Sequence, residues 1–253
     1  MLVSLQGAWR LFRLVVHVLH GIWVAAREFG AANEAQRCAH IQWWAAKLLR
    51  VLGIALKVEG RFANGPQLLV ANHVSWLDII AVHAVCPQAR FVSKSDVRGW
   101  PVLGWLVGKA GTLFIERENK RDALRVVHQM AEALRQGDTV AVFPEGTTGD
   151  GHGLLPFHAN LLQAAVATGT ATQPLALRYA EPGHAVSPTA MWVGDTTLLQ
   201  SLWRIVTTPG IAVQVQVLAP QDPTGLERRA LATLLSRRIG NALGAQSPVS
   251  PAH

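Results

Sequence analysis

A histidine and an aspartate five residues apart are the first side chains able to do chemistry. His73 and Asp78 lie in the segment NHVSWLD, directly after an apolar run that predicts a strand. A helix that begins at Trp76 would put Asp78 in its first turn, within reach of the His73 ring. A carboxylate on one ring nitrogen fixes the tautomer and leaves the other nitrogen to accept a proton. The pair therefore predicts a general base that activates a substrate hydroxyl, because the chain has no G-x-S-x-G segment for a serine nucleophile.

The same residues also have a purely structural interpretation. Ser75 and Asp78 have the spacing of a helix capping box, in which Ser75 would cap a helix that begins at Trp76. An acidic residue is favoured in the first turn of any helix, because the N–H groups there carry partial positive charge. On these residues alone, both interpretations stay open.

Three further polar segments follow or contain apolar runs. Arg117 ends the run GTLFIER, and its planar guanidinium suits a phosphate or carboxylate, with a surface ion pair to Glu116 or Asp122 as the alternative. Glu145 begins a loop of small residues after the run VAVFP, where backbone N–H groups can approach a polar ligand or simply form a turn. A strand opened by proline, Gln173–Arg178, comes last and is plausible as a structural element.

In this order and at these spacings, the four segments resemble the glycerolipid acyltransferase family, the lysophosphatidic acid acyltransferases and their relatives. The family's N-H-x4-D, G-x-x-F-I-x-R and F-P-E-G-T motifs and its proline-containing strand all stand between residues 70 and 178. The resemblance implies an O-acyltransferase that moves a fatty-acyl group from acyl-CoA or acyl carrier protein to a lysolipid hydroxyl. It implies no cofactor beyond that thioester co-substrate.

The resemblance also implies a role for each matching position. His73 would be the general base, and Asp78 would orient it. The substrate-binding residues would be the headgroup contact Lys94, the phosphate ligand Arg117, and the acceptor-site residues Glu145, Gly146 and Thr147.

One position departs from the motif of the phosphatidic-acid-forming relatives. Thr148 follows Glu-Gly-Thr where those relatives commonly carry arginine, and Asp150 adds an acid nearby. Losing a cation and gaining an acid weakens the binding of a doubly charged phosphate. The variant is more similar to bacterial relatives that acylate lyso-ornithine lipid, so we expect either lysophosphatidic acid or a lyso-ornithine lipid as acceptor.

Positioning these side chains requires alternating strands and helices. An apolar stripe predicts a helix over 119–136, closed by Gly137, and a capping box at Thr224–Glu227 predicts a last helix that runs to about Leu243. The pattern indicates an α/β fold with a central, largely parallel sheet flanked by helices, whose ligands bind at the carboxyl ends of the strands. The predicted strands are Gln67–Ala71, Arg90–Ser93, Gly111–Ile115, Thr139–Phe143, Gln173–Arg178, Ala190–Val193 and Ile211–Leu218.

Residues 1–58 form a predicted N-terminal helical motif that contacts a membrane. Two apolar stretches, Leu11–Ala26 and Ala39–Leu56, carry basic residues and are separated by a polar break. Both are too short or too charged for an ordinary membrane span, so we expect them to lie in one leaflet, with core-packing helices as the alternative. Their basic residues favour the cytoplasmic face of the inner membrane. An α/β acyltransferase domain at 59–243 and a flexible tail at 244–253 would follow.

The composition agrees with a protein that contacts lipid. Half of the residues are hydrophobic, 15% are charged, nine are Trp and the net charge is +7. A basic surface attracts nucleic acid, anionic lipid or CoA-like substrates, but the tryptophans are not interleaved with basic patches as nucleic-acid stacking platforms are. We therefore expect membrane lipids as partners and no nucleic acid. A lipid hydrolase that uses His73, or a non-catalytic membrane-binding protein, is the alternative.

No metal site is expected from the residue pattern. The two cysteines, Cys38 and Cys86, have neither the spacing of metal ligands nor that of a disulfide framework. Asp150, His152 and His158 can be imagined as ligands, but no cysteine accompanies them.

Overall fold

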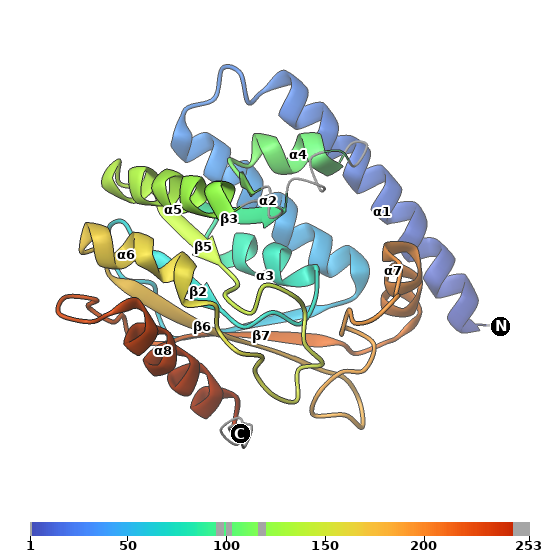
Figure 1. Cartoon of the computed structure of the whole chain (residues 1–253). Helices are drawn as coiled ribbons and strands as arrows, with labels where there is room; N and C mark the ends of the chain where they lie inside the picture. The colour runs from blue at the N-terminus through green and yellow to red at the C-terminus, as the bar shows by residue number, and fades with distance from the viewer. Residues whose placement is uncertain (1, 95–98, 100–102, 116–119, 245–253) are drawn as a thin grey trace.

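A seven-stranded sheet forms the centre of the molecule (Figure 1). The computed structural model describes residues 2–94, 99, 103–115 and 120–244. The strand order is β1-β7-β6-β2-β5-β3-β4, and among the described strand pairs only β6 and β7 run antiparallel. The predicted α/β fold with a largely parallel sheet is therefore confirmed. The strands are β1 (Ala55–Glu59), β2 (Leu68–Ala71), β3 (Ala89–Lys94), β4 (Leu113–Ile115), β5 (Thr139–Val142), β6 (Thr172–Ala180) and β7 (Ala212–Val217).

Helices cover both faces of the sheet (Figure 1). On one face α2 packs on α3, and α1 packs on α2, α4 and α7; the other face is covered by α5, α6 and α8. The helices are α1 (Leu2–Arg27), α2 (Glu34–Leu52), α3 (Leu77–Val85), α4 (Leu103–Lys109), α5 (Lys120–Arg135), the 3-10 helix η2 (Ala159–Leu162), α6 (Gln163–Thr168), α7 (Leu198–Thr207) and α8 (Arg228–Leu243).

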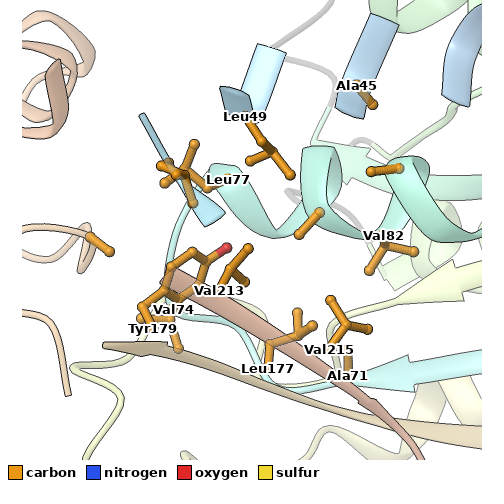
Figure 2. Close-up of a cluster of buried hydrophobic side chains, with 14 of the residues drawn as sticks. Ala45, Leu49, Ala71, Val74, Leu77, Val82, Leu177, Tyr179, Val213 and Val215 are labelled. Atoms are coloured by element: carbon orange, nitrogen blue, oxygen red, sulfur yellow. The ribbon is translucent and has the colours of Figure 1, made fainter. Parts of the chain in front are cut away.

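Alternating side chains of the central strands divide the core into two layers. In β2, Leu69 and Ala71 join the cluster under α2 and α3, whereas Leu68 and Val70 join the cluster under α5 and α8. This alternation follows from the two-residue period of a strand. Figure 2 shows the first layer, where side chains of α2 and α3 face those of β6 and β7. Burying each large aliphatic side chain there stabilises the fold by about 1.5–3 kcal/mol before entropy is counted.

The second N-terminal helix ends earlier than its apolar stretch suggests. Asn33 caps α2 through a capping box with Gln36, and both hydrogen bonds measure 2.9 Å. Gly53, with a φ of +81°, adopts the left-handed conformation and ends the helix. The predicted helical stretch Ala39–Leu56 is therefore too long at its end. The chain enters β1 instead, a strand that the sequence pattern did not predict.

The predicted strand Ala190–Val193 is wrong. These residues form a turn and a loop, and the backbone N–H of Trp192 donates to the carbonyl of Val74 at 3.0 Å. The loop therefore crosses over the segment that follows β2 and does not extend the sheet.

The predicted capping box of the last helix is also wrong. α8 begins at Arg228, and its cap residue Glu227 makes no side-chain hydrogen bond to the helix. Thr224 lies in the preceding turn, where its backbone N–H donates to the Asp222 carboxylate at 2.8 Å. The end of α8 at Leu243 agrees with prediction. α5 covers Lys120–Arg135 of the predicted 119–136, and residue 119 lies outside the described residues.

The N-terminal motif consists of the two expected helices. α1 is 26 residues long and begins at Leu2, nine residues earlier than the apolar stretch that predicted it. Across the part of the chain that the structure describes, no helix combines the length and apolar character needed to cross a membrane.

Candidate active site

The ring of His73 contacts the carboxylate of Asp78, as the spacing predicted. His73 lies in the loop after β2, and its Nδ1 is 2.7 Å from Oδ2 of Asp78. The loop is fixed by Asn72, whose side chain exchanges two hydrogen bonds with the backbone of Leu177 in β6. The His73 side chain is 19% exposed, whereas the Asp78 side chain is fully buried. Because Nδ1 faces Asp78, Nε2 lies on the opposite side of the ring.

Asp78 accepts hydrogen bonds from the backbone of the loop that precedes α3. The helix begins at Leu77, and Oδ2 of Asp78 accepts from the N–H groups of Val74 and Ser75 at 2.7 and 2.9 Å. Ser75 Oγ is buried without a hydrogen-bond partner among the described residues, so the expected serine cap is wrong. Oδ2 of Asp78 therefore holds the loop before the helix and also meets the imidazole.

Tyr179 is a part of this cluster that the sequence did not predict. Tyr179 lies near the carboxyl end of β6, and its hydroxyl donates to Oδ1 of Asp78 at 2.7 Å. Burial, followed by the negative charge of Asp78, raises the pKa of Tyr179 well above its ordinary value, so the phenol keeps its proton and remains a donor. Tyr179 follows Leu175 and Leu177 on the same face of β6, which is the only sequence signal that marks it as inward-facing.

Aromatic rings hold the plane of the His73 imidazole. The ring of Phe143, just after β5, stacks on His73 with 4.1 Å between centroids and 10° between planes. Phe91 of β3 stacks in turn on Phe143, with 5.7 Å between the ring centroids. The residues that follow the carboxyl ends of the adjacent strands β2 and β5 therefore meet at His73, where parallel sheets usually bind their ligands.

The carboxylate of Glu145 holds the His73 backbone. Its Oε1 accepts from the His73 N–H and its Oε2 from the Leu155 N–H, both at 2.7 Å. The residue is buried, and burial raises its pKa to about 7 in spite of these hydrogen bonds. Both oxygens are occupied by backbone donors, so we interpret Glu145 as a clamp on His73. Its expected contact with the acceptor stays a prediction.

The rest of the Glu145 loop also touches the His73 segment. Gly146, with a φ of +73°, closes the turn through its N–H to the Phe143 carbonyl at 3.1 Å. Thr147 is exposed, and Gly149 N–H donates to the His73 carbonyl at 2.7 Å. Both backbone groups of His73 are therefore held by the same loop.

The side chains of two expected binding residues, Lys94 and Arg117, lie outside the described part of the structure. Lys94 is the last residue of β3 and pairs in register with Ile115 of β4, but its side chain is outside the described residues. Arg117 lies two positions beyond β4, also outside the described residues. The headgroup contacts predicted for both residues stay predictions.

A cavity of about 350 Å³ lies behind the aromatic row, between α1, α2, α3, α4 and β3. Its wall is mostly apolar and includes Trp23, Trp44, Ile80, Phe91 and Leu106. Phe91 lines the cavity and stacks on Phe143, which in turn stacks on His73, so a row of rings connects the cavity wall to the histidine. The size and lining are those of a site for an apolar ligand.

The sequence is similar to proteins whose family is known. The sequence profile described as "Acyltransferase" matches residues 55–178. The lyso-ornithine lipid O-acyltransferase of Pseudomonas aeruginosa is 39% identical over 223 residues, which cover 87% of this chain and 85% of that protein. The chain belongs to the acyltransferase family.

Other relatives agree with this assignment. The 1-acyl-sn-glycerol-3-phosphate acyltransferase of Neisseria meningitidis is 38% identical over 192 residues, covering 72% of this acyltransferase and 71% of that protein. The crystal structure of the 1-acyl-sn-glycerophosphate acyltransferase from Thermotoga maritima matches with a TM-score of 0.68 at 20% identity, over 93% of this chain and 96% of that one. That likeness shows a shared fold.

In this acyltransferase, the profile match begins at the first residue of β1 and ends inside β6. It includes His73, Asp78 and Glu145, and it stops one residue before Tyr179. The helices α1 and α2 precede the match, so the apolar cavity lies where the matched region meets the N-terminal helices.

Proposed function

We propose that this acyltransferase moves a fatty-acyl group from acyl-CoA or acyl carrier protein to the hydroxyl of a lysolipid, with His73 as general base. The observation that carries the proposal is the 2.7 Å contact between His73 Nδ1 and a fully buried Asp78 carboxylate. Three further donors, from Val74, Ser75 and Tyr179, hold that carboxylate in place. A buried carboxylate fixed in this way keeps the imidazole in one tautomer.

The reaction then needs no protein nucleophile. Nε2 of His73 takes the proton of the lysolipid hydroxyl as the hydroxyl oxygen attacks the thioester carbonyl. The tetrahedral intermediate expels the thiolate, which takes the proton back from the imidazolium. Asp78 stabilises the imidazolium between these steps, as in the histidine–aspartate half of a catalytic triad.

The apolar cavity supports a site for the donor's fatty-acyl chain. Most of its wall consists of apolar side chains of tryptophan, isoleucine, leucine and phenylalanine, and these suit a hydrocarbon chain. The row of rings connects this wall to His73, so a chain inside the cavity would bring its thioester to the edge of that row. Burying each methylene of such a chain contributes about 0.8 kcal/mol.

Thr148 supports a lyso-ornithine lipid as acceptor over lysophosphatidic acid. Its hydroxyl donates to the Trp192 carbonyl, so the side chain holds two loops together and brings no positive charge to the site. Asp150 is exposed close by. A doubly charged phosphate gains most from a cation at such a position, whereas a zwitterionic headgroup needs it less. The Pseudomonas aeruginosa relative carries the name of a lyso-ornithine lipid enzyme.

The exposed face of α1 supports attachment to one leaflet of the inner membrane at its cytoplasmic face. Large apolar side chains recur along it at three- and four-residue spacing, and α1 contains no Asp or Glu. We call these residues the α1 stripe; they are Leu5, Trp9, Phe12, Val16, Leu19 and Trp23, each at least half exposed.

A competition between acceptors tests this function. The purified protein is given one acyl-CoA and an equimolar mixture of lysophosphatidic acid and lyso-ornithine lipid, with the His73→Ala variant as the blank. We expect acylated ornithine lipid to accumulate faster than phosphatidic acid. A strong preference for the phosphate acceptor would overturn the interpretation of Thr148. Release of free fatty acid with no acylated lipid would replace the transferase by a hydrolase.

A further inference from the structure

α7 presents a second exposed apolar surface, far from the N-terminal helices in sequence. Leu199 and Trp203, one turn apart, are 78% and 48% exposed. The opposite side of the helix is in the core, where Ser201, Ile205 and Val206 are buried. A large leucine and a tryptophan on successive turns of one exposed face are unusual for a helix that contacts only water.

This surface is fastened to α1. Thr207 is the next residue in the row of Leu199 and Trp203, and a Cβ added at Gly7 of α1 would lie only 2.8 Å from its methyl carbon. Arg10 of α1 donates to two carbonyls at the end of α7, those of Val206 at 3.0 Å and Thr208 at 3.3 Å. Figure 1 shows α7 beside the N-terminal part of α1. The row on α7 therefore ends against α1.

The charges of the two helices fit an anionic lipid surface. Neither α1 nor α7 contains Asp or Glu, while Arg13 of α1 and Arg204 of α7 are exposed beside the apolar rows. Basic residues at the edge of an apolar helix face gain from anionic headgroups while the apolar side chains enter the acyl region.

α7 is also joined directly to the active-site segment. Trp76, which lies between His73 and Asp78 in sequence, donates its ring N–H to Ser201 Oγ of α7 at 3.1 Å. If a surface fixes the position of α7, it therefore also fixes the distance between that surface and the His73 segment.

We propose that α7 is a third membrane-contacting helix, which inserts Leu199 and Trp203 into the leaflet that receives the α1 stripe and so sets the distance between His73 and the lipid surface. The proposal rests on the membrane-bound lysolipid acyltransferase function given above. The partner is a bilayer that contains anionic phospholipid. A second copy of the chain is the other possible occupant of this surface, and the experiment separates the two.

The test is vesicle flotation of the full chain with phosphatidylethanolamine vesicles that contain phosphatidylglycerol. Replacing Leu199→Ser together with Trp203→Ser removes two lipid-buried side chains, so we expect the partition coefficient to fall about 10- to 100-fold. Leu124→Ser is the matched control, because Leu124 is 67% exposed on α5, which covers the opposite face of the sheet. The control should float like the wild type. Equal flotation of the α7 variant and the wild type would overturn the proposal.

Two further measurements keep the outcome clear. The Trp203→Phe variant retains an apolar ring, and we expect it to bind vesicles while losing part of the tryptophan quenching that brominated lipids cause; unchanged quenching would contradict insertion. Size-exclusion chromatography without lipid checks the other occupant, and a dimer that the α7 variant abolishes would assign the surface to a second copy.

The α1 stripe distinguishes failure of this proposal from failure of the proposed function. If Trp9→Ser with Phe12→Ser abolishes flotation and the α7 variant floats normally, α7 is not a membrane element but the membrane-bound function stands. If neither variant loses flotation, membrane attachment through these helices is itself wrong, and the proposal for α7 falls with it.

Discussion

The hydroxyl of Tyr179 donates to Oδ1 of Asp78 at 2.7 Å, while Oδ2 of the same carboxylate lies 2.7 Å from Nδ1 of His73. Each carboxylate oxygen therefore has its own side-chain partner. Turning the carboxylate away from either partner would break a buried hydrogen bond. A buried acceptor that loses its donor costs about 1–3 kcal/mol. The tyrosine thus acts on the imidazole through Asp78, as a positioning residue.

Replacing Tyr179→Phe should lower kcat about tenfold or more and leave KM for the acyl donor nearly unchanged. The ring stays in the core, but Oδ1 of Asp78 loses a donor to a charged group, which is worth about 1.5–3 kcal/mol. Steady-state kinetics measure this separation of kcat from KM. Leu177→Val, on the same face of β6, is the control for a simple loss of core packing, and it should cost about 1 kcal/mol of stability without lowering kcat.

Replacing His73→Ala should reduce acyl transfer by about 10²–10⁴-fold, the usual contribution of a general base. The fold should survive, because Glu145 and Gly149 hold backbone groups of His73 that alanine retains. Thermal unfolding compares the two proteins. Near-normal transfer by a folded variant would end the assignment of His73 as base.

Glu145 should make the stability of the protein depend on pH in an unusual direction. Burial raises its pKa from 4.5 to about 7, so the folded state holds a proton more tightly than the unfolded state does. The stabilisation from that proton is complete below 4.5 and is lost as the pH rises through 7, by at most about 3 kcal/mol. Urea unfolding of the wild type and of Glu145→Gln across this range isolates the contribution. Curves that stay parallel at every pH would contradict it.

Filling the cavity should change the preferred acyl chain. Ile80→Trp adds a large ring to the cavity wall, so we expect KM for long-chain acyl-CoA to rise about tenfold, with short-chain acyl-CoA little affected. Ile80→Leu conserves the side-chain volume and serves as the control. An equal change in KM for all chain lengths would argue that the cavity does not hold the acyl chain.

Contacts that are local in sequence were predictable, and contacts between distant strands were not. The His73–Asp78 contact spans five residues and follows from a strand, a short loop and the first turn of a helix. Tyr179 reaches the same carboxylate from 101 residues away, because β6 lies beside β2, and no local pattern gives that strand order. Sequence alone predicted an acceptor contact or an exposed turn for Glu145. The exposed turn is wrong because Glu145 is buried, the acceptor contact stays a prediction, and the hold of its two oxygens on the backbone was not predicted.

The errors in the predicted elements have local causes. β1 was hidden because its first residues continue the apolar stretch of α2, and only the left-handed Gly53 and Ile54 separate the two elements. The segment Ala190–Val193 is apolar because it covers the loop after β2, and apolar residues that cover a loop resemble a short buried strand. α7 was not predicted at all, since a ten-residue amphipathic run is close to the shortest helix that periodicity can detect.

The pairing of β1 with β7 has a consequence for how the chain is made. β1 lies at one edge of the sheet, and its neighbour β7 leaves the ribosome about 150 residues after it. Until then the first two helices have emerged from the exit tunnel while the edge of the sheet beneath them is still open. Such long-range closure is slow, so α1 and α2 stay without their finished sheet for longer than helices whose strands pair locally.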